Sequence, residues 1–213
     1  MKRTLILFVS ALGFAAALVA AWWSGADGRA AARLANPQAA ITLGRSYGQG
    51  FPATDGELLH NLIVERGFKR VLDIGTAHGY SAIWFALAVR KTGGRVVTLE
   101  IDPAAARKAR ENFRDAGVSD RIDSRVADAL VEIPRLASDF DFVFMDVGAT
   151  LNKELLKLVY SHVPAGGAIA AHNAFSFYFN QREFLKAIRN SPEWETRIVP
   201  TRSGGISISV KKA

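Results

Sequence analysis

The chain has 213 residues, a length that fits one domain plus an appendage, and its 49% hydrophobic content is enough to bury a core. It contains no cysteine, which excludes disulfides, thiolate metal sites and cysteine nucleophiles. The formal net charge is +7, but the Lys and Arg residues are scattered and no basic run alternates with aromatic residues, so we expect no nucleic-acid partner.

The N-terminus has the pattern of a targeting segment. Lys2 and Arg3 precede an apolar run over Leu5–Trp23, which is typical of a signal peptide or a signal anchor and has about the minimum length of a membrane span. Val19–Ala21 offers small residues at which a signal peptide is cleaved, so cleavage and anchoring both stay open. We expect three parts: a signal or anchor segment at 1–23, a linker rich in Ala, Gly and Arg at 24–50, and one domain at 51–213.

Five short apolar runs follow, and each is typical of a strand in a parallel sheet that is buried on both faces. The fourth run is the strongest, because it holds Phe142, Val143, Phe144 and Met145 in succession. The predicted strands are Val71–Ile74, Val96–Leu99, Ile122–Val126, Phe140–Met145 and Ala168–Ala171.

Helical spacing of apolar residues separates these runs. Asp102 and Pro103 start one such helix and Gly117 ends it, a sound pair of boundary signals, and its basic residues lie at solvated positions. Thr54 or Asp55 is a plausible N-cap of the first helix. The predicted helices are Asp55–Arg66, Ser81–Arg90, Pro103–Ala116, Leu151–Tyr160 and Gln181–Arg189, and the basic residues are Arg107, Lys108, Arg110 and Arg114.

The last segment predicts a hairpin. Thr196–Val199 and Ile206–Val210 flank a turn with two glycines that follow Ser203. Strands that alternate with helices and then close on a hairpin indicate an α/β fold, a doubly wound, seven-stranded, mostly parallel sheet of the Rossmann-like type with a C-terminal antiparallel hairpin.

The run from Val71 to Ser81 is the most informative motif, because it passes from strand to glycine turn to helix. Gly75 lets the backbone leave the strand and lets a ligand approach, and Gly79 allows close packing where the next helix begins. Asp73, just before the turn, is placed to carry a carboxylate toward the amino end of a ligand. The spacing lacks the middle glycine of a dinucleotide fingerprint, and the alternative is a tight turn that binds nothing.

Two further acidic residues end the next two strands. Glu100 lies 25 positions after Gly75, where a carboxylate binds the hydroxyls of a ribose in doubly wound folds, and its alternative is a surface glutamate. Asp128 follows the third strand and is placed to hold an adenine amine, or else to cap a helix. The prediction of a nucleotide-cofactor site rests on the order of these residues, because each lies at or just after the carboxyl end of a successive strand.

From Thr54 to Val210 the chain resembles the class I S-adenosylmethionine-dependent methyltransferases, and within them the O-methyltransferase family that includes the catechol and caffeoyl-coenzyme A enzymes. The resemblance rests on the Gly75 turn and on five other motifs: Asp55-Gly56-Glu57-Leu58-Leu59, Glu100-Ile101-Asp102, Asp128-Ala129, Phe144-Met145-Asp146, and Gly166-Gly167 with Asn173. It implies S-adenosylmethionine as cofactor, with contacts at Asp73, Gly75, Gly79, Ser81, Glu100, Asp128 and Asp146.

The resemblance also implies a catalytic centre with a divalent metal, held by an Asp after the fourth strand and an Asp-Asn pair after the fifth. Asp146 and Asn173 match the first and last ligands, but His172 stands at the middle position. An imidazole suits zinc, manganese or iron better than magnesium. Asp146 and His172 are thus expected to be catalytic, and His172 is either a metal ligand or a general base.

A second departure concerns a lysine. The family places a Lys three residues after the first metal ligand, where this chain has Ala149, and Lys153 takes its place only if the loop is rearranged. His78 replaces a small polar residue and is expected to be a loop contact. Phe175 opens an aromatic run with Phe177, Tyr178 and Phe179, which either borders an aromatic acceptor or packs against Trp84 or Trp194.

The sequence thus favours O-methylation of a small molecule, with a non-catalytic cofactor-binding or membrane-scaffold protein as the alternative. A homodimer is compatible with the sequence. Because S-adenosylmethionine is made and kept in the cytoplasm, we expect a membrane anchor at the N-terminus with the domain facing the cytoplasm, although Lys2 and Arg3 also suit an exported form.

Overall fold

A computed structural model describes residues 53–137, 139–175, 181–201 and 203–213, and these residues form one seven-stranded sheet with helices on both faces. The predicted segments 1–23 and 24–50, and three of the predicted aromatic residues, Phe177, Tyr178 and Phe179, lie outside the described residues. The strands are β1 (Arg70–Ile74), β2 (Arg95–Glu100), β3 (Ile122–Val126), β4 (Phe142–Met145), β5 (Ala168–His172), β6 (Trp194–Val199) and β7 (Ile206–Lys211).

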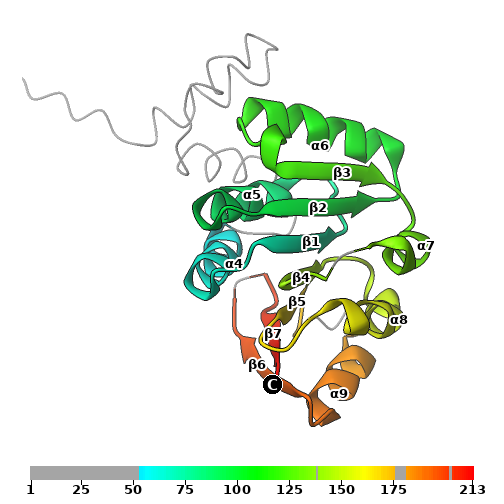
Figure 1. The fold of residues 1–213 in the computed structure, drawn as a ribbon. Coiled ribbons are helices and arrows are strands. Elements are labelled where there is room, and N and C mark those ends of the chain that lie inside the picture. Colours follow the sequence, from blue (N-terminus) through cyan, green and yellow to red (C-terminus); the bar gives the residue numbers. More distant parts are fainter. Residues whose placement is uncertain (1–52, 138, 176–180, 202) are drawn as a thin grey trace, which may run out of the picture.

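The strand order is β3-β2-β1-β4-β5-β7-β6, and the first five strands run parallel (Figure 1). β7 lies between β5 and β6 and is antiparallel to both. The predicted fold is therefore confirmed, including the closing hairpin. The order reverses between β1 and β4, and in such sheets the crevice outside the carboxyl ends of the strands at this point is where ligands bind.

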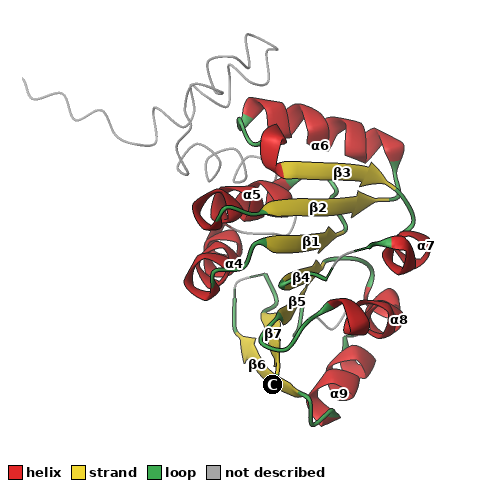
Figure 2. Cartoon of the chain, in the orientation of Figure 1, coloured by secondary structure: helices red, strands yellow, loops and turns green. Residues whose placement is uncertain are grey.

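The helices form two layers (Figure 2). One core cluster packs α4 and α5 against the face of the sheet that carries Phe142 and Phe144, and the other packs α8 and α9 against the face with Val143 and Met145. Successive residues of β4 thus enter opposite cores, as a strand buried on both faces requires. The helices are α4 (Ala53–Arg66), α5 (Tyr80–Thr92), α6 (Pro103–Asp115), α7 (Ala129–Glu132), α8 (Ala149–Val159) and α9 (Arg182–Asn190), with short 3-10 turns η1 (Ser119–Arg121), η2 (Ile133–Arg135) and η3 (Tyr160–His162).

Predicted boundaries differ from the structure by one or two residues, and α7 with its 3-10 extension was not predicted. β4 begins at Phe142 because Asp141 serves the loop before it: its carboxylate accepts hydrogen bonds from the backbone N–H groups of Lys69 and Arg70 at 2.8 and 2.9 Å. This carboxylate connects the amino ends of β1 and β4. It thus lies at the opposite end of the strands from the crevice in which such sheets bind ligands.

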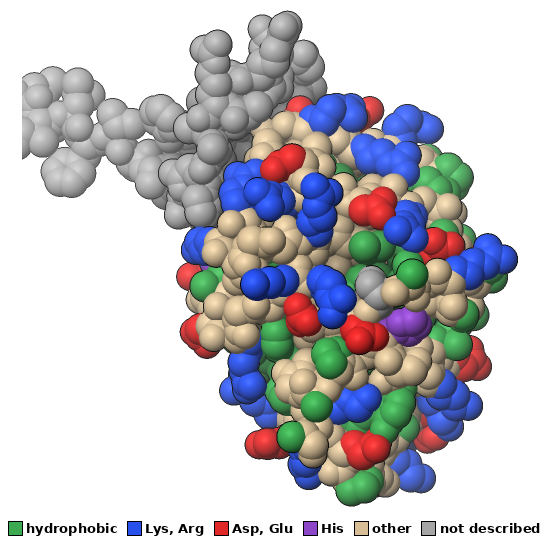
Figure 3. All heavy atoms as spheres, in the orientation of Figure 1, with side chains coloured by type: hydrophobic (Ala, Val, Ile, Leu, Met, Phe, Trp, Pro, Cys, Tyr) green, Lys and Arg blue, Asp and Glu red, His purple; other side chains and the backbone are tan. Residues whose placement is uncertain are grey.

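Charged side chains of both signs are interspersed on the face shown in Figure 3. On α6, Arg107, Arg110 and Arg114 are exposed, so the predicted solvated face is confirmed. None of the helices in the described ranges is long and apolar enough to cross a membrane.

Candidate active site

The turn after β1 requires its glycines. Gly75 has a φ of 98°, and a Cβ on it would lie 2.5 Å from the backbone oxygen of Asp146, so a side chain there would push the ends of β1 and β4 apart. Gly79 has a φ of 88°, and a Cβ on it would lie 2.3 Å from the ring of Phe113 on α6. α5 begins one residue later, at Tyr80. The predicted strand–turn–helix geometry is present.

A pocket lies beside this turn at the carboxyl ends of β1, β2 and β3. Of the residues expected to bind the cofactor, Gly75, Glu100 and Asp128 line it, together with apolar residues that include Ile101 and Leu151. Ile101 is 68% exposed, which is unusual for a large aliphatic side chain. The lining thus offers carboxylates at two strand ends and an apolar wall, the combination that a nucleoside needs.

The two pocket carboxylates also hold the loops that carry them. Glu100 accepts hydrogen bonds from the backbone N–H groups of Ala77 and Asp102 at 2.7 and 2.9 Å. Asp128 accepts from the N–H of Leu130 at 2.9 Å and is the N-cap of α7, so the capping role that the sequence left open is present. Glu100 and Asp128 therefore both line the pocket and stabilise the loops around it.

Asp73 lies under the turn rather than in the lining of the pocket. Its side chain is fully buried and accepts hydrogen bonds from the hydroxyls of Thr98 at 2.7 Å and Ser81 at 3.1 Å. Burial raises the pKa of Asp73 to about 7, because these two hydrogen bonds offset only part of the cost of removing the charge from water. Asp73, Gly79, Ser81 and Asp146 are outside the set of residues that lines the pocket.

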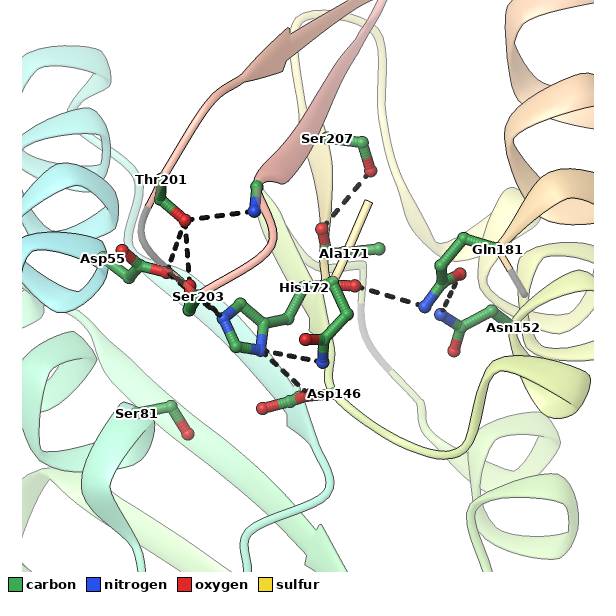
Figure 4. A network of polar contacts seen from close by, with 12 residues as sticks. Asp55, Ser81, Asp146, Asn152, Ala171, His172, Gln181, Thr201, Ser203 and Ser207 are labelled. Carbon is green, nitrogen blue, oxygen red and sulfur yellow. Dashed lines mark hydrogen bonds and ion pairs between the residues drawn. The ribbon is translucent and has the colours of Figure 1, made fainter. Parts of the chain in front are cut away.

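A second cluster lies at the ends of β4 and β5 (Figure 4). Nδ1 of His172 is 3.4 Å from Oδ1 of Asp146 and 3.1 Å from Nδ2 of Asn173. Asn173 has a φ of 60°, a left-handed conformation that asparagine tolerates, so the chain turns directly after β5 and its amide lies beside the ring. The structure thus brings together the three residues that the sequence assigned to a catalytic or metal centre.

Asp55 completes this cluster, and sequence reasoning placed it only as a helix cap. Its carboxylate is fully buried and lies 3.2 Å from Nε2 of His172. Thr201 and Ser203, from the turn between β6 and β7, donate their hydroxyls to the same carboxylate oxygen. The one available signal was that Asp55-Gly56 opens the segment that resembles the methyltransferase family.

Each ring nitrogen of His172 thus faces one carboxylate. Burial opposes the charged imidazole, but the hydrogen bonds and charges of Asp146 and Asp55 outweigh it and raise the pKa of His172 to about 9. Burial likewise opposes ionisation of Asp55, yet the bonds from His172, Ser203 and Thr201 hold its pKa below the usual range. With these neighbours His172 is protonated at neutral pH, and a base or ligand role requires that a proton leave the ring.

The donor set also fits a divalent ion in its spacing. Two ligands of one tetrahedral ion lie roughly 3.4 Å apart at metal–ligand distances of about 2.1 Å, which matches the separation of Nδ1 of His172 and Oδ1 of Asp146. An amide flip of Asn173 offers its oxygen as a third donor. Within the described ranges there is no group of three or more His, Cys, Asp or Glu side chains placed to hold a metal, and the third donor here is an amide.

Three other predicted residues lie elsewhere. Lys153 reaches Glu183 on α9 at 3.4 Å, so it does not stand in for the lysine that the family has. His78 accepts a hydrogen bond through its backbone oxygen from Asn112 at 2.8 Å, as a loop contact does. Phe175 is 59% exposed and lies against Gly205, where a Cβ would come within 2.5 Å of its ring.

Comparison with known proteins agrees with this geometry. The O-methyltransferase family matches residues 41–180 of the chain. The chain belongs to the O-methyltransferase family. Among curated relatives, a catechol O-methyltransferase of Mycobacterium tuberculosis is 34% identical over 145 residues, 62% of this chain and 66% of the relative. The chain thus spans slightly less than two thirds of that relative, and 37% of a catechol O-methyltransferase of Niastella koreensis.

Two solved structures with a similar fold contain S-adenosylmethionine or its product S-adenosylhomocysteine. An O-methyltransferase of Bacillus cereus in complex with S-adenosylhomocysteine has a TM-score of 0.71 and 27% identity, and the match covers 80% of this chain and 88% of that one. One of Streptomyces achromogenes, involved in tomaymycin synthesis and in complex with S-adenosylmethionine, has a TM-score of 0.69 and 26% identity over 76% and 81% of the two chains. The resemblance and the fold that the sequence indicated are confirmed.

Proposed function

We propose that this O-methyltransferase family member transfers the methyl group of S-adenosylmethionine to a hydroxyl of a small molecule. The observation that carries the proposal is the juxtaposition of two sites along one edge of the sheet. Gly75, Glu100 and Asp128 line a pocket at β1–β3, and Asp146 and His172 lie beside it at β4 and β5.

The pocket suits the adenosine end of the cofactor. Glu100 is placed to accept hydrogen bonds from the two ribose hydroxyls, and Asp128 from the adenine amine, because their carboxylate oxygens keep lone pairs beside those that now accept from the backbone. Ile101 and Leu151 give the flat base an apolar wall. The charged methionine end then points along the sheet toward β4, which places the methyl group near Asp146.

The reaction is an in-line displacement: the acceptor oxygen bonds to the methyl carbon as the carbon–sulfur bond breaks, and S-adenosylhomocysteine leaves. Positioning does most of the work, since the sulfonium is already reactive. The hydroxyl proton must also go to a base, and Nδ1 of His172 is the nitrogen that faces the centre. We propose that Asp146 and His172 hold the acceptor hydroxyl and that Nδ1 takes its proton in the molecules whose imidazole is neutral, because a charged ring must first lose its own Nδ1 proton.

A divalent metal is the second way to handle that proton. Asp146, His172 and Asn173 are the residues that would hold it, and an imidazole donor favours zinc, manganese or iron. A bound ion would act as a Lewis acid and lower the pKa of the acceptor hydroxyl. EDTA separates the two routes, because it inhibits the metal route strongly and leaves the metal-free route unchanged.

The acceptor is proposed to be aromatic. Phe175 is a large exposed apolar side chain two residues after Asn173, and a flat apolar acceptor would cover it. Catechol is the first acceptor to try, since two curated relatives carry that name.

Two measurements test the function. Calorimetry on the purified protein should show binding of S-adenosylhomocysteine and none of NAD, and methyl transfer should be followed with labelled S-adenosylmethionine over a panel of catechols and other phenols. Binding of NAD alone would contradict the cofactor assignment. Binding of S-adenosylhomocysteine with no turnover on any acceptor would instead support the non-catalytic scaffold.

Membrane anchoring stays a proposal that rests on the apolar run Leu5–Trp23 of the sequence, and a homodimer stays a proposal with which the sequence is compatible. The full-length protein should partition with membranes, and a version that starts near Ala40 should not. Recovery of the intact, uncleaved chain in the soluble fraction would contradict the anchor.

A further inference from the structure

The strongest feature outside the predicted centre is the buried polar clasp of Asp55, Thr201 and Ser203 around Nε2 of His172. Oδ2 of Asp55 lies 3.2 Å from Nε2 and 3.1 Å from the hydroxyl of Thr201. The hydroxyl of Ser203 bonds to the same oxygen and lies 2.9 Å from Nε2. Three donors thus converge on one carboxylate oxygen.

The directions of these bonds determine which ring nitrogen keeps its proton. Asp55 as a carboxylate only accepts. Ser203 has a single hydroxyl proton, which it donates to Asp55, so toward His172 its oxygen can only accept. Both neighbours of Nε2 are therefore acceptors, and Nε2 must carry a hydrogen. The nitrogen that gains or loses a proton or a ligand is then Nδ1, which faces Asp146 and Asn173.

The clasp is built by parts of the fold that do not belong to the cofactor site. Asp55 lies in the first turn of α4, and packing of α4 on α5 holds it in place, because a Cβ on Gly56 would lie 2.2 Å from the ring of Trp84. Thr201 and Ser203 come from the turn between β6 and β7. Asp55 is fully buried and His172 is 2% exposed, so water does not compete for the bond between these two residues, whereas Thr201 and Ser203 are partly buried.

We infer that Asp55 is a positioning residue for methyl transfer: it holds the Nε2–H of His172 and so presents Nδ1 to the reaction centre. The expected effect on kcat rests on the proposed function, whereas the hydrogen bond between Asp55 and the Nε2–H of His172 does not. It serves the base route and the metal route alike, because a carboxylate behind a working imidazole fixes both its tautomer and its orientation.

The test is Asp55→Ala in the full chain, with two independent readouts. Loss of a partner that orients a working histidine costs about 10–100-fold in activity, so kcat should fall by that factor while the KM for S-adenosylmethionine and the affinity for S-adenosylhomocysteine stay unchanged. In proton NMR, the Nε2–H of His172 should give a far-downfield resonance, assigned by its absence in His172→Gln, and Asp55→Ala should lose it. Asp55→Glu, which restores a carboxylate, should recover part of kcat.

Asp141→Asn is the matched control, because Asp141 is a carboxylate that only holds backbone N–H groups at the far edge of the sheet. It should lower the melting temperature and change neither kcat nor the resonance. If Asp55→Ala does not fold, the isosteric Asp55→Asn carries the test: its neutral amide either accepts more weakly from the Nε2–H or donates to Nε2, so the resonance should move upfield or disappear and kcat should fall.

A folded Asp55 variant with wild-type kcat, or with the resonance intact, would overturn the inference. Loss of the resonance in Ser203→Ala but not in Asp55→Ala would also overturn it, because the partner would then be Ser203. If the wild-type protein methylates no acceptor, the proposed function fails while the resonance still decides the role of Asp55.

Discussion

The two halves of the proposed site, a cofactor side and a catalytic side, are assembled from the sequence in different ways. On the cofactor side, Asp73, Gly75 and Ser81 belong to one strand–turn–helix unit, and Glu100 ends the neighbouring strand. On the catalytic side, Asp55 and Ser203 meet although 148 positions separate them in sequence. Local geometry shapes the first half, whereas packing of α4, β5 and the β6–β7 turn shapes the second. A change on one side should therefore leave the other largely intact.

The largest expected effect concerns the buried carboxylate on the cofactor side. The pKa of Asp73 is raised from 3.8 to about 7, so the folded protein binds a proton more tightly than the unfolded chain. The contribution of Asp73 to the free energy of unfolding is therefore greatest below pH 4. It falls by roughly 4 kcal/mol as the pH rises to about 7. Asp73→Asn should lack this loss, as measured by denaturant unfolding at several pH values between 4 and 8.

An Asp73→Asn protein with the same pH dependence as the wild type in that range would show that Asp73 titrates normally. Asp141→Asn serves as the control: it removes a carboxylate that accepts hydrogen bonds from the backbone N–H groups of Lys69 and Arg70, and the wild-type loss of stability between pH 4 and 8 should remain.

The next effect separates turnover from binding. His172→Ala should lower methyl transfer at least about a hundredfold, the low end for general acid–base catalysis, because Nδ1 of His172 faces Asp146 at the centre. Affinity for S-adenosylhomocysteine should change little, as measured by calorimetry. Unchanged turnover would remove His172 from the mechanism, and a matching loss of affinity would mean that the two halves are not independent.

Glu100→Ala should do the reverse. Loss of its carboxylate leaves the ribose hydroxyls and the backbone N–H groups of Ala77 and Asp102 without an acceptor. We expect affinity for S-adenosylhomocysteine to fall by about 1–3 kcal/mol, the cost of unpaired polar groups, while kcat at saturating cofactor stays near the wild-type value. Full affinity in this variant would place the ribose elsewhere.

The smallest effect is expected for Lys153→Ala. Lys153 and Glu183 form a pair whose side chains are 48% and 64% exposed, and such exposed pairs contribute about 0–1 kcal/mol. Turnover should equal that of the wild type, because the side chain points to α9 rather than to the centre. A large loss of turnover would show that Lys153 reaches the acceptor in the working enzyme, in place of the lysine that the family has.

The sequence by itself determined the fold and the glycine turn beside the pocket. Apolar runs of strand length, helical spacing between them and the Gly75 turn each follow from local rules of backbone and burial, so they can be read along the chain. Asp146, His172 and Asn173 were found the same way, because residues at the ends of adjacent parallel strands must meet at one edge of the sheet. Short elements such as α7 escaped, since four residues carry too little periodicity.

Only the tertiary structure decided what surrounds those residues. Asp55 looked like a helix cap, and its partnership with His172 depends on how α4 and the β6–β7 turn pack on the end of β5. The protonation of His172 and Asp73 was likewise beyond the sequence. A pKa shift is a balance between burial and a few directed hydrogen bonds, and both are set by contacts between residues far apart in the chain.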